Sequence, residues 1–101
     1  MSAIVVLSTD LMDRSRFPAG ATFVRRADDL PADAEVVVVD LGRPDAVEGV
    51  RRLRTEGSTA RILGYGSHVD TDVLREARAA GCDRVLARSA FFADVAAALA
   101  G

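Results

Sequence analysis

Short apolar runs, separated by segments of mixed polarity, recur along the chain. Two of them, Ala3–Leu7 and Val36–Val39, are rich in β-branched residues and do not alternate with polar ones. Runs of this kind are typical of strands that are covered on both faces, as in a parallel sheet. Weaker runs at 21–24, 61–65 and 84–87 predict three further strands. We expect Ala3–Leu7 and Val36–Val39 to be central strands that solvent barely reaches.

Apolar residues at helical spacing fill the segments between the later strands. Residues 46–53 and 73–80 each carry apolar side chains at positions i, i+1, i+4 and i+7. The second of these helices has N-cap candidates at 70–72 and ends at Gly81, and a last helix begins at the N-cap Ser89. Only 11–17 and 27–34 are available for the two earlier helices, which are therefore expected to be short.

This alternation of strands and helices predicts an α/β fold. Right-handed crossovers between successive strands give a flavodoxin-like three-layer sandwich, with a five-stranded parallel sheet in the order 2-1-3-4-5 and helices on both faces. A length of 101 residues is common for one domain, so we expect residues 1–101 to form a single domain.

Charge and composition exclude several classes of function. Thirteen basic residues, all arginine, stand against fifteen acidic ones, a net charge of −2 that gives no electrostatic reason to expect nucleic acid or an acidic membrane surface as a partner. Without lysine, no Schiff base or P-loop lysine can form. No apolar run approaches the roughly 20 residues of a membrane span, and no secretory signal pattern opens the chain, so a cytoplasmic location is expected. The single cysteine, Cys82, excludes an internal disulfide and, with one histidine, a Cys/His zinc site.

Candidate chemistry lies at the carboxyl ends of the predicted strands. In an open α/β sheet, ligands bind beyond these ends, next to the point where the strand order reverses. The polar and glycine residues there are Ser8, Thr9, Asp10, Asp40, Gly66, Ser67 and Arg88. The segment Gly64-Tyr65-Gly66 is expected to be a tight loop rather than a phosphate-binding one, because a dinucleotide fingerprint needs three spaced glycines after the first strand.

Two segments carry a resemblance to a known family. Val-Val-Val-Val-Asp-Leu-x-x-Pro-Asp at 36–45 resembles the phosphoacceptor segment of response-regulator receiver domains, which have the CheY-like form of this fold. Ala-Ala-Gly-Cys-Asp at 79–83 is similar to the turn before the last strand of the same family. The resemblance implies that Asp40 occupies the phosphoacceptor position. It also implies two acidic residues after the first strand, which would hold Mg²⁺ together with Asp40.

The remaining receiver positions depart from the family's pattern. The two acidic positions hold Ser8 and Thr9, whose neutral hydroxyls cannot replace carboxylates around a hard divalent cation, and Asp10 comes one position later. The family's serine or threonine after the fourth strand falls on Gly66, with Ser67 beside it, and its lysine falls on Arg88. Arginine keeps the charge but not the compact ammonium group. We therefore expect the receiver fold without receiver chemistry.

Three functions remain open at this point. The favoured one is a pseudo-receiver, a signalling domain that acts by phosphorylation-independent protein–protein interaction, with no catalytic residue, metal or cofactor. The first alternative is an atypical phosphoacceptor whose metal site uses Asp10 and Asp40. The second is a small flavodoxin-like enzyme or flavin carrier, which the shortage of reactive and aromatic side chains disfavours.

The expected partner surface comprises the fourth helix, the fifth strand and the fifth helix. Val73, Leu74 and Ala77 should face the sheet, whereas Arg75, Arg78 and Asp94 should point outward. A helix cannot bury two adjacent phenylalanines equally, so one of Phe91 and Phe92 should be partly exposed on this surface. Such a mixture fits a protein partner or a homodimer. The residues proposed for this surface are Arg75, Arg78, Phe91, Phe92 and Asp94.

Overall fold

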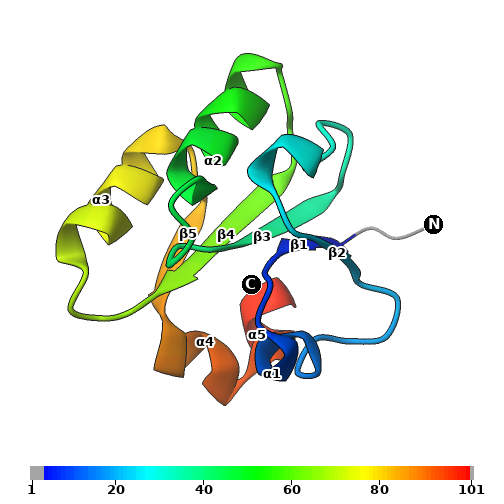
Figure 1. Ribbon diagram of the computed structural model, residues 1–101, viewed down its shortest axis with the longest axis vertical. Helices are drawn as coiled ribbons and strands as arrows, with labels where there is room; N and C mark the ends of the chain where they lie inside the picture. Colours follow the sequence, from blue (N-terminus) through cyan, green and yellow to red (C-terminus); the bar gives the residue numbers. More distant parts are fainter. Residues whose placement is uncertain (1–3, 101) are drawn as a thin grey trace.

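A parallel sheet of five strands forms the centre of the protein (Figure 1). The computed structural model describes residues 4–100. The strands are β1 (Ile4–Leu7), β2 (Thr22–Val24), β3 (Val36–Asp40), β4 (Arg61–Gly66) and β5 (Arg84–Ala87). Every pairing is parallel and the order is β2-β1-β3-β4-β5, as predicted. The sequence therefore has a flavodoxin-like fold of the receiver type.

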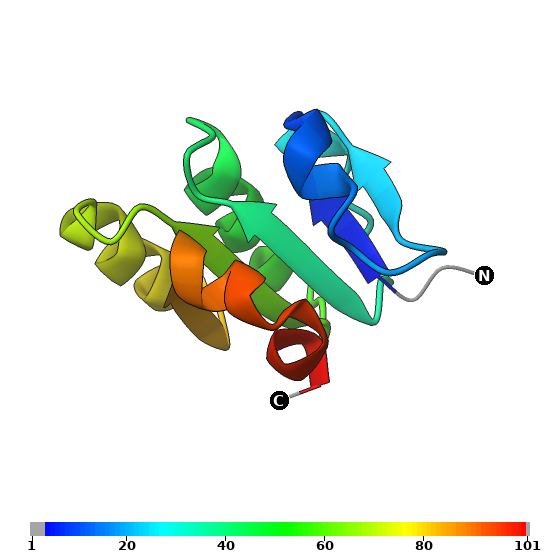
Figure 2. The same cartoon turned by 90° about the horizontal axis from the view of Figure 1, so that it is seen from below.

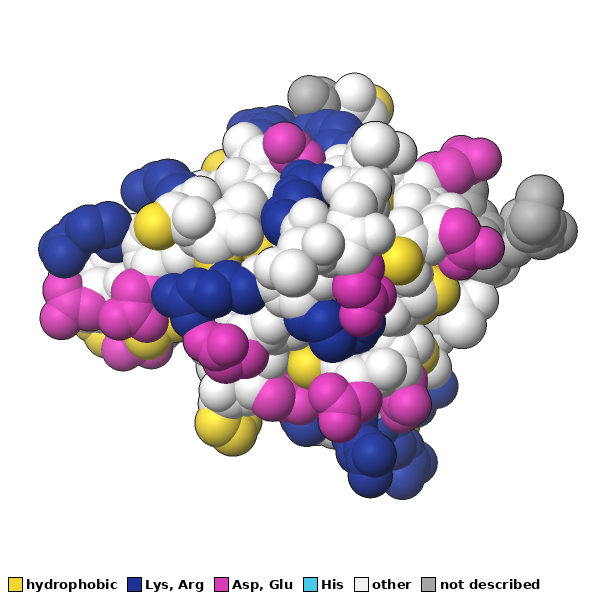
Figure 3. Space-filling view, turned by 90° about the horizontal axis from the view of Figure 1, so that it is seen from above, with side chains coloured by type: hydrophobic (Ala, Val, Ile, Leu, Met, Phe, Trp, Pro, Cys, Tyr) yellow, Lys and Arg dark blue, Asp and Glu magenta, His cyan; other side chains and the backbone are white. Residues whose placement is uncertain are grey.

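Helices cover both faces of the sheet (Figures 1 and 2). One face carries the 3-10 helix η1 (Ala27–Asp29), α2 (Ala46–Thr55) and α3 (Thr71–Ala80), and the other carries α1 (Leu11–Arg14), α4 (Arg88–Ala93) and α5 (Val95–Ala100). On the outer surface of η1, α2 and α3, acidic and basic side chains are interspersed (Figure 3). Successive strand residues point to opposite faces, so Val37 and Val39 join one core cluster and Val38 the other.

The two central apolar runs are almost inaccessible to solvent, as predicted. Residues 5–7 and 37–39 are each at most 5% exposed, and the first residues of these strands, Ile4 and Val36, are partly buried. Ala3, which the first predicted run includes, lies outside the described residues.

The first two helices are even shorter than predicted. The α1 helix has four residues, and the predicted helix over 27–34 is reduced to the single turn η1. This turn is held against α2 by Asp45, whose Oδ2 accepts the Ala27 N–H at 2.9 Å, and by Arg52, which donates to the Ala27 carbonyl at 2.8 Å. A Cβ at Gly49 would lie 2.7 Å from the Ala27 Cβ, so the close approach of α2 to η1 requires glycine at that position.

The last predicted helix is in fact two helices, which corrects one prediction about its exposure. Ala87, not Ser89, is the N-cap of α4. The helical segment is interrupted at Asp94, whose Oδ1 accepts the Ala97 N–H at 3.0 Å and so caps α5. The expectation that Phe91 or Phe92 is partly exposed is wrong, because they are 0% and 7% exposed.

The position of α4 explains why both phenylalanines are buried. The ring of Phe91 stacks on Tyr65 of β4, with centroids 5.0 Å apart. The ring of Phe92 packs edge-on against both Tyr65 and Phe17, which follows α1. The short α4 is therefore enclosed by the sheet on one side and by the α1 segment on another, and two neighbouring positions of the helix can be buried at once.

Candidate functional site at the carboxyl end of the sheet

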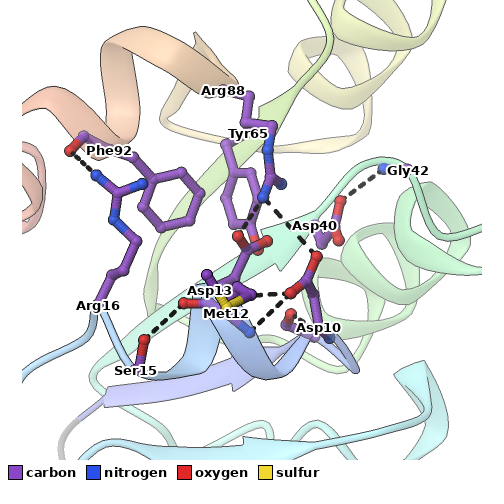
Figure 4. Close-up of polar contacts among 11 residues, drawn as sticks. Asp10, Met12, Asp13, Ser15, Arg16, Asp40, Gly42, Tyr65, Arg88 and Phe92 are labelled. Carbon is purple, nitrogen blue, oxygen red and sulfur yellow. Dashed lines mark hydrogen bonds and ion pairs between the residues drawn. The ribbon is translucent and has the colours of Figure 1, made fainter.

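The structure brings three of the predicted site residues together, keeps Ser8 beside them through its bond to Asp10, and leaves Thr9 and Ser67 exposed. Asp10, Asp40 and Arg88 come from the ends of β1, β3 and β5 and lie around one another (Figure 4). Ser67 is exposed, and its Oγ only accepts the Val69 N–H at 3.4 Å within the loop after β4. Thr9 is also exposed and accepts a hydrogen bond from Arg43 at 3.3 Å.

Asp10 is occupied in starting α1. Its Oδ1 accepts the N–H groups of Met12 at 2.8 Å and Asp13 at 3.2 Å, the arrangement of an N-cap. The buried hydroxyl of Ser8 in turn accepts the Asp10 N–H at 3.2 Å. Ser8 and Asp10 thus build the turn from β1 into α1 with their own hydrogen bonds.

Asp13 is the site residue that the sequence analysis missed. It lies three positions after Asp10, on the same side of α1, and is only 1% exposed. The Tyr65 hydroxyl donates to its Oδ2 at 3.3 Å, and Arg88 donates to its Oδ1 (Figure 4). The signal that could have revealed it is the Asp-x-x-Asp spacing on the single helix that follows β1.

Arg88 places a permanent positive charge among these carboxylates. Its guanidinium contacts Asp13 and lies 3.9 Å from the Asp10 Oδ2. It also lies over two aromatic rings, 5.7 Å from the Tyr65 centroid and 5.1 Å from that of Phe92. The hydrogen bond to Asp13 raises the pKa of Arg88 further above its ordinary value, so this group stays protonated.

Asp40 ends β3 and is partly buried at the edge of the site. Its Oδ1 accepts the Gly42 N–H at 2.9 Å. Burial raises the pKa of the Asp40 carboxyl, and this effect is opposed by the Gly42 N–H and by the charge of Arg88. The carboxylate therefore lies at the carboxyl end of β3, bonded to the loop that follows the strand.

Leu41 packs on β4 at its two glycines. A Cβ at Gly66 would lie 3.2 Å from the Leu41 Cβ and 3.3 Å from the Leu74 Cδ2. A Cβ at Gly64 would lie 3.0 Å from the Leu41 Cδ1. Both glycines belong to β4 and are buried, so the prediction of a tight loop over 64–66 is wrong. Glycine occurs here because Leu41 packs directly on the strand.

The residues of this site do not fit the Mg²⁺ ion that the receiver resemblance implies. Mg²⁺ needs oxygen ligands in near-octahedral geometry. The Asp10 carboxylate already accepts hydrogen bonds from two backbone N–H groups, and the Asp13 carboxylate accepts them from Arg88 and Tyr65. The Arg88 guanidinium also places a positive charge next to both carboxylates, which would repel a metal ion. Across residues 4–100, no three His, Cys, Asp or Glu side chains are arranged to hold a metal ion.

The structure shows how exposed each residue predicted for the partner surface is. Arg75, Arg78 and Asp94 are exposed, and Val73, Leu74 and Ala77 pack on the core, as predicted. Arg75 forms an exposed ion pair with Asp72 at 3.2 Å. Arg78 donates to the Val85 carbonyl at 3.4 Å, at the outer edge of β5.

The protein has an α/β fold of the receiver type, as its strand order, its helix layers and the aspartate at the end of β3 indicate. A response regulator in red light signalling of R. palustris superposes with a TM-score of 0.71 at 19% identity, over 97% of this chain and 88% of that one. A two-component response regulator of the LuxR family from Aurantimonas sp. gives 0.68 at 24% identity, over 97% and 84%.

A third solved structure has the same fold. It is a response regulator from Burkholderia pseudomallei with a phosphorylated aspartic acid, a calcium ion and citrate, and it gives a TM-score of 0.68 at 18% identity over 95% of this chain and 64% of that one. At these identities the likeness establishes the fold. No protein-family model matches the sequence, and a search of curated proteins finds no match.

No helix within residues 4–100 is long and apolar enough to cross a membrane.

Proposed function

We propose that this chain is a pseudo-receiver, a cytoplasmic signalling domain that acts by protein–protein interaction without phosphorylation. The observation that carries the proposal is the bond between Arg88 and the buried carboxylate of Asp13. The fold that the chain shares with response regulators supports a signalling role.

The electrostatics of the site support the loss of phosphoryl chemistry. In a receiver, the carboxylates would share a divalent cation that also binds the phosphoryl oxygens. Here the positive charge is that of Arg88, which is paired with Asp13 and, as part of the chain, cannot leave the site as a metal ion can. A phosphoryl group on Asp40 would therefore have no exchangeable cation beside it to neutralise its charge.

The experiment is a paired measurement on the full chain. Isothermal titration with Mg²⁺ should give no saturable binding in the sub-millimolar range, and incubation with acetyl phosphate should leave the mass of the protein unchanged. Mg²⁺ affinity in that range, or a phosphoryl adduct that is lost in Asp40→Asn, would instead establish the atypical phosphoacceptor.

The surface of α3, β5 and α4–α5 is the proposed interface with a protein partner or a second copy. Because Phe91 and Phe92 are buried, the residues predicted for this surface that are exposed are Arg75, Arg78 and Asp94. Charged rims of this kind determine specificity and association rate more than affinity. Sedimentation of Arg78→Glu should show altered self-association or partner binding at unchanged stability. If neither changes, this surface is not the interface.

A further inference from the structure

A groove runs between α2 and α3 on the face opposite to α4. It has a volume of about 390 Å³, and its apolar lining comes from Leu41, Pro44, Val47 and Val73. Val47 and Val73 are only partly buried, although both pack on the core. The groove therefore presents aliphatic surface to solvent, on a face that is otherwise largely charged (Figure 3).

The charges around this groove are unequally compensated. On the α2 side, Arg43 pairs with Asp45 and Arg51 pairs with Glu48. On the α3 side, the carboxylates of Asp70 and Glu76 have no ion-pair or hydrogen-bond partner within residues 4–100. One wall of the groove thus carries two uncompensated negative charges.

The side chain of an aspartate at the position of Asp70 ordinarily bonds to its own helix. Asp70 is the N-cap residue of α3, a position where an aspartate side chain usually accepts a backbone N–H of the first turn. Its carboxylate accepts none. Asp70 and Glu76 both line the groove, one just before the first residue of α3 and the other in its second turn. The acidic wall therefore offers two anionic groups beside the aliphatic floor.

We propose that this groove binds an amphipathic helix of a partner protein. One face of that helix would carry an aliphatic residue with Arg or Lys one turn before it and one turn after it. The aliphatic side chain would enter between Val47 and Val73, and the two cations would pair with Asp70 and Glu76. On a helix, residues three to four positions apart lie on one face, so the aliphatic residue and both cations can face the groove together. This inference rests on the proposed interaction function and names a second surface for it.

The test uses a synthetic helical peptide of 14 residues (~20 Å of helix) with Leu at its centre and Arg one turn to each side. Backbone amide shifts of the ¹⁵N-labelled full chain report where it binds. We expect shifts at Val47 and Val73, and an affinity that falls by about tenfold in Glu76→Arg, because a rim cation replaces an anion. Asp33→Arg is the matched control: it makes the same charge change at an exposed residue of the η1–β3 loop and should leave the affinity within about twofold.

Three results would overturn the inference. They are the absence of binding, shifts located outside the groove, and equal weakening by Asp33→Arg and Glu76→Arg. A companion peptide with Glu in place of both Arg should not bind, and one with Ser in place of Leu should bind more weakly. If Glu76→Arg alters only self-association in sedimentation, the occupant is a second copy and the partner helix is wrong. The Mg²⁺ and acetyl phosphate measurements on the same protein fail or succeed independently of these outcomes.

Discussion

Arg88 donates to a carboxylate 75 positions away in the chain, that of Asp13, which solvent does not reach. The first residue of α4 thereby joins α1 across the end of the sheet, with the Tyr65 hydroxyl as a third member at 3.3 Å from Asp13. A buried carboxylate that loses its cation retains an uncompensated charge. Removing Arg88 would therefore leave Asp13 buried without a counter-charge.

Replacing Arg88 with methionine should destabilise the protein by about 2 kcal/mol, since Asp13 then remains buried without its counter-charge. The value lies at the low end for a buried pair, because the Arg88 side chain is 43% exposed. Urea unfolding measures the loss. Arg84→Met is the control, since Arg84 is exposed and its removal should change stability by less than about 0.5 kcal/mol. Equal losses in the two variants would show that the ion pair has no special role.

Removing Arg88 should also make the site responsive to Mg²⁺. In Arg88→Ala, the carboxylates of Asp10 and Asp13 lose the cation beside them, and hard carboxylate oxygens are the ligands that Mg²⁺ prefers. We expect Mg²⁺ to raise the thermal unfolding temperature of this variant but not that of the wild type. Adding Asp13→Asn should abolish the effect. A wild-type protein that is stabilised equally by Mg²⁺ would contradict the role given to Arg88.

The pH dependence of stability should report the burial of Asp40. Burial raises the pKa of this carboxyl above its ordinary value of 3.8, so the folded protein binds the proton more readily than the unfolded chain does. Ionisation of Asp40 therefore costs stability as the pH rises through the folded pKa. Asp40→Asn should be more stable than the wild type near neutral pH, and the difference should shrink as the pH falls towards 3.8. Denaturant unfolding at several pH values measures the gap, and a gap that widens on acidification would refute the sign.

Gly66→Thr should destabilise the protein by about 2 kcal/mol, the typical cost of overpacking a filled core. The new Cβ would be 3.2 Å from the Leu41 Cβ and 3.3 Å from the Leu74 Cδ2, so both side chains must move. In a Leu74→Ala background the same substitution should cost less, because the Leu74 methyl groups are then absent. Thermal unfolding of the four proteins in this cycle gives the coupling, and additive effects would mean that Leu74 does not exclude a side chain at position 66.

The fold was predictable because its signals are local. Because the runs of β1 and β3 are apolar at successive positions, both faces of each strand must be covered. The helices of 46–53 and 73–80 instead carry one apolar side each. Strand order then follows from the handedness of crossovers. The final helix was not predictable as two, because its break at Asp94 depends on the cap that this residue makes for α5 and on the enclosure of α4 by Phe17 and Tyr65.

The chemistry of the site divides in the same way. By itself, the sequence determined the strand ends at which Asp10, Asp40 and Arg88 lie and the absence of an acidic pair directly after β1, because both depend only on residue type and element order. Only the tertiary structure decided that Arg88 bonds Asp13 and that Leu41 packs against Gly66. The physical reason is that an ion pair and a steric exclusion depend on distances between side chains from different elements, which the order of residues along one chain does not specify.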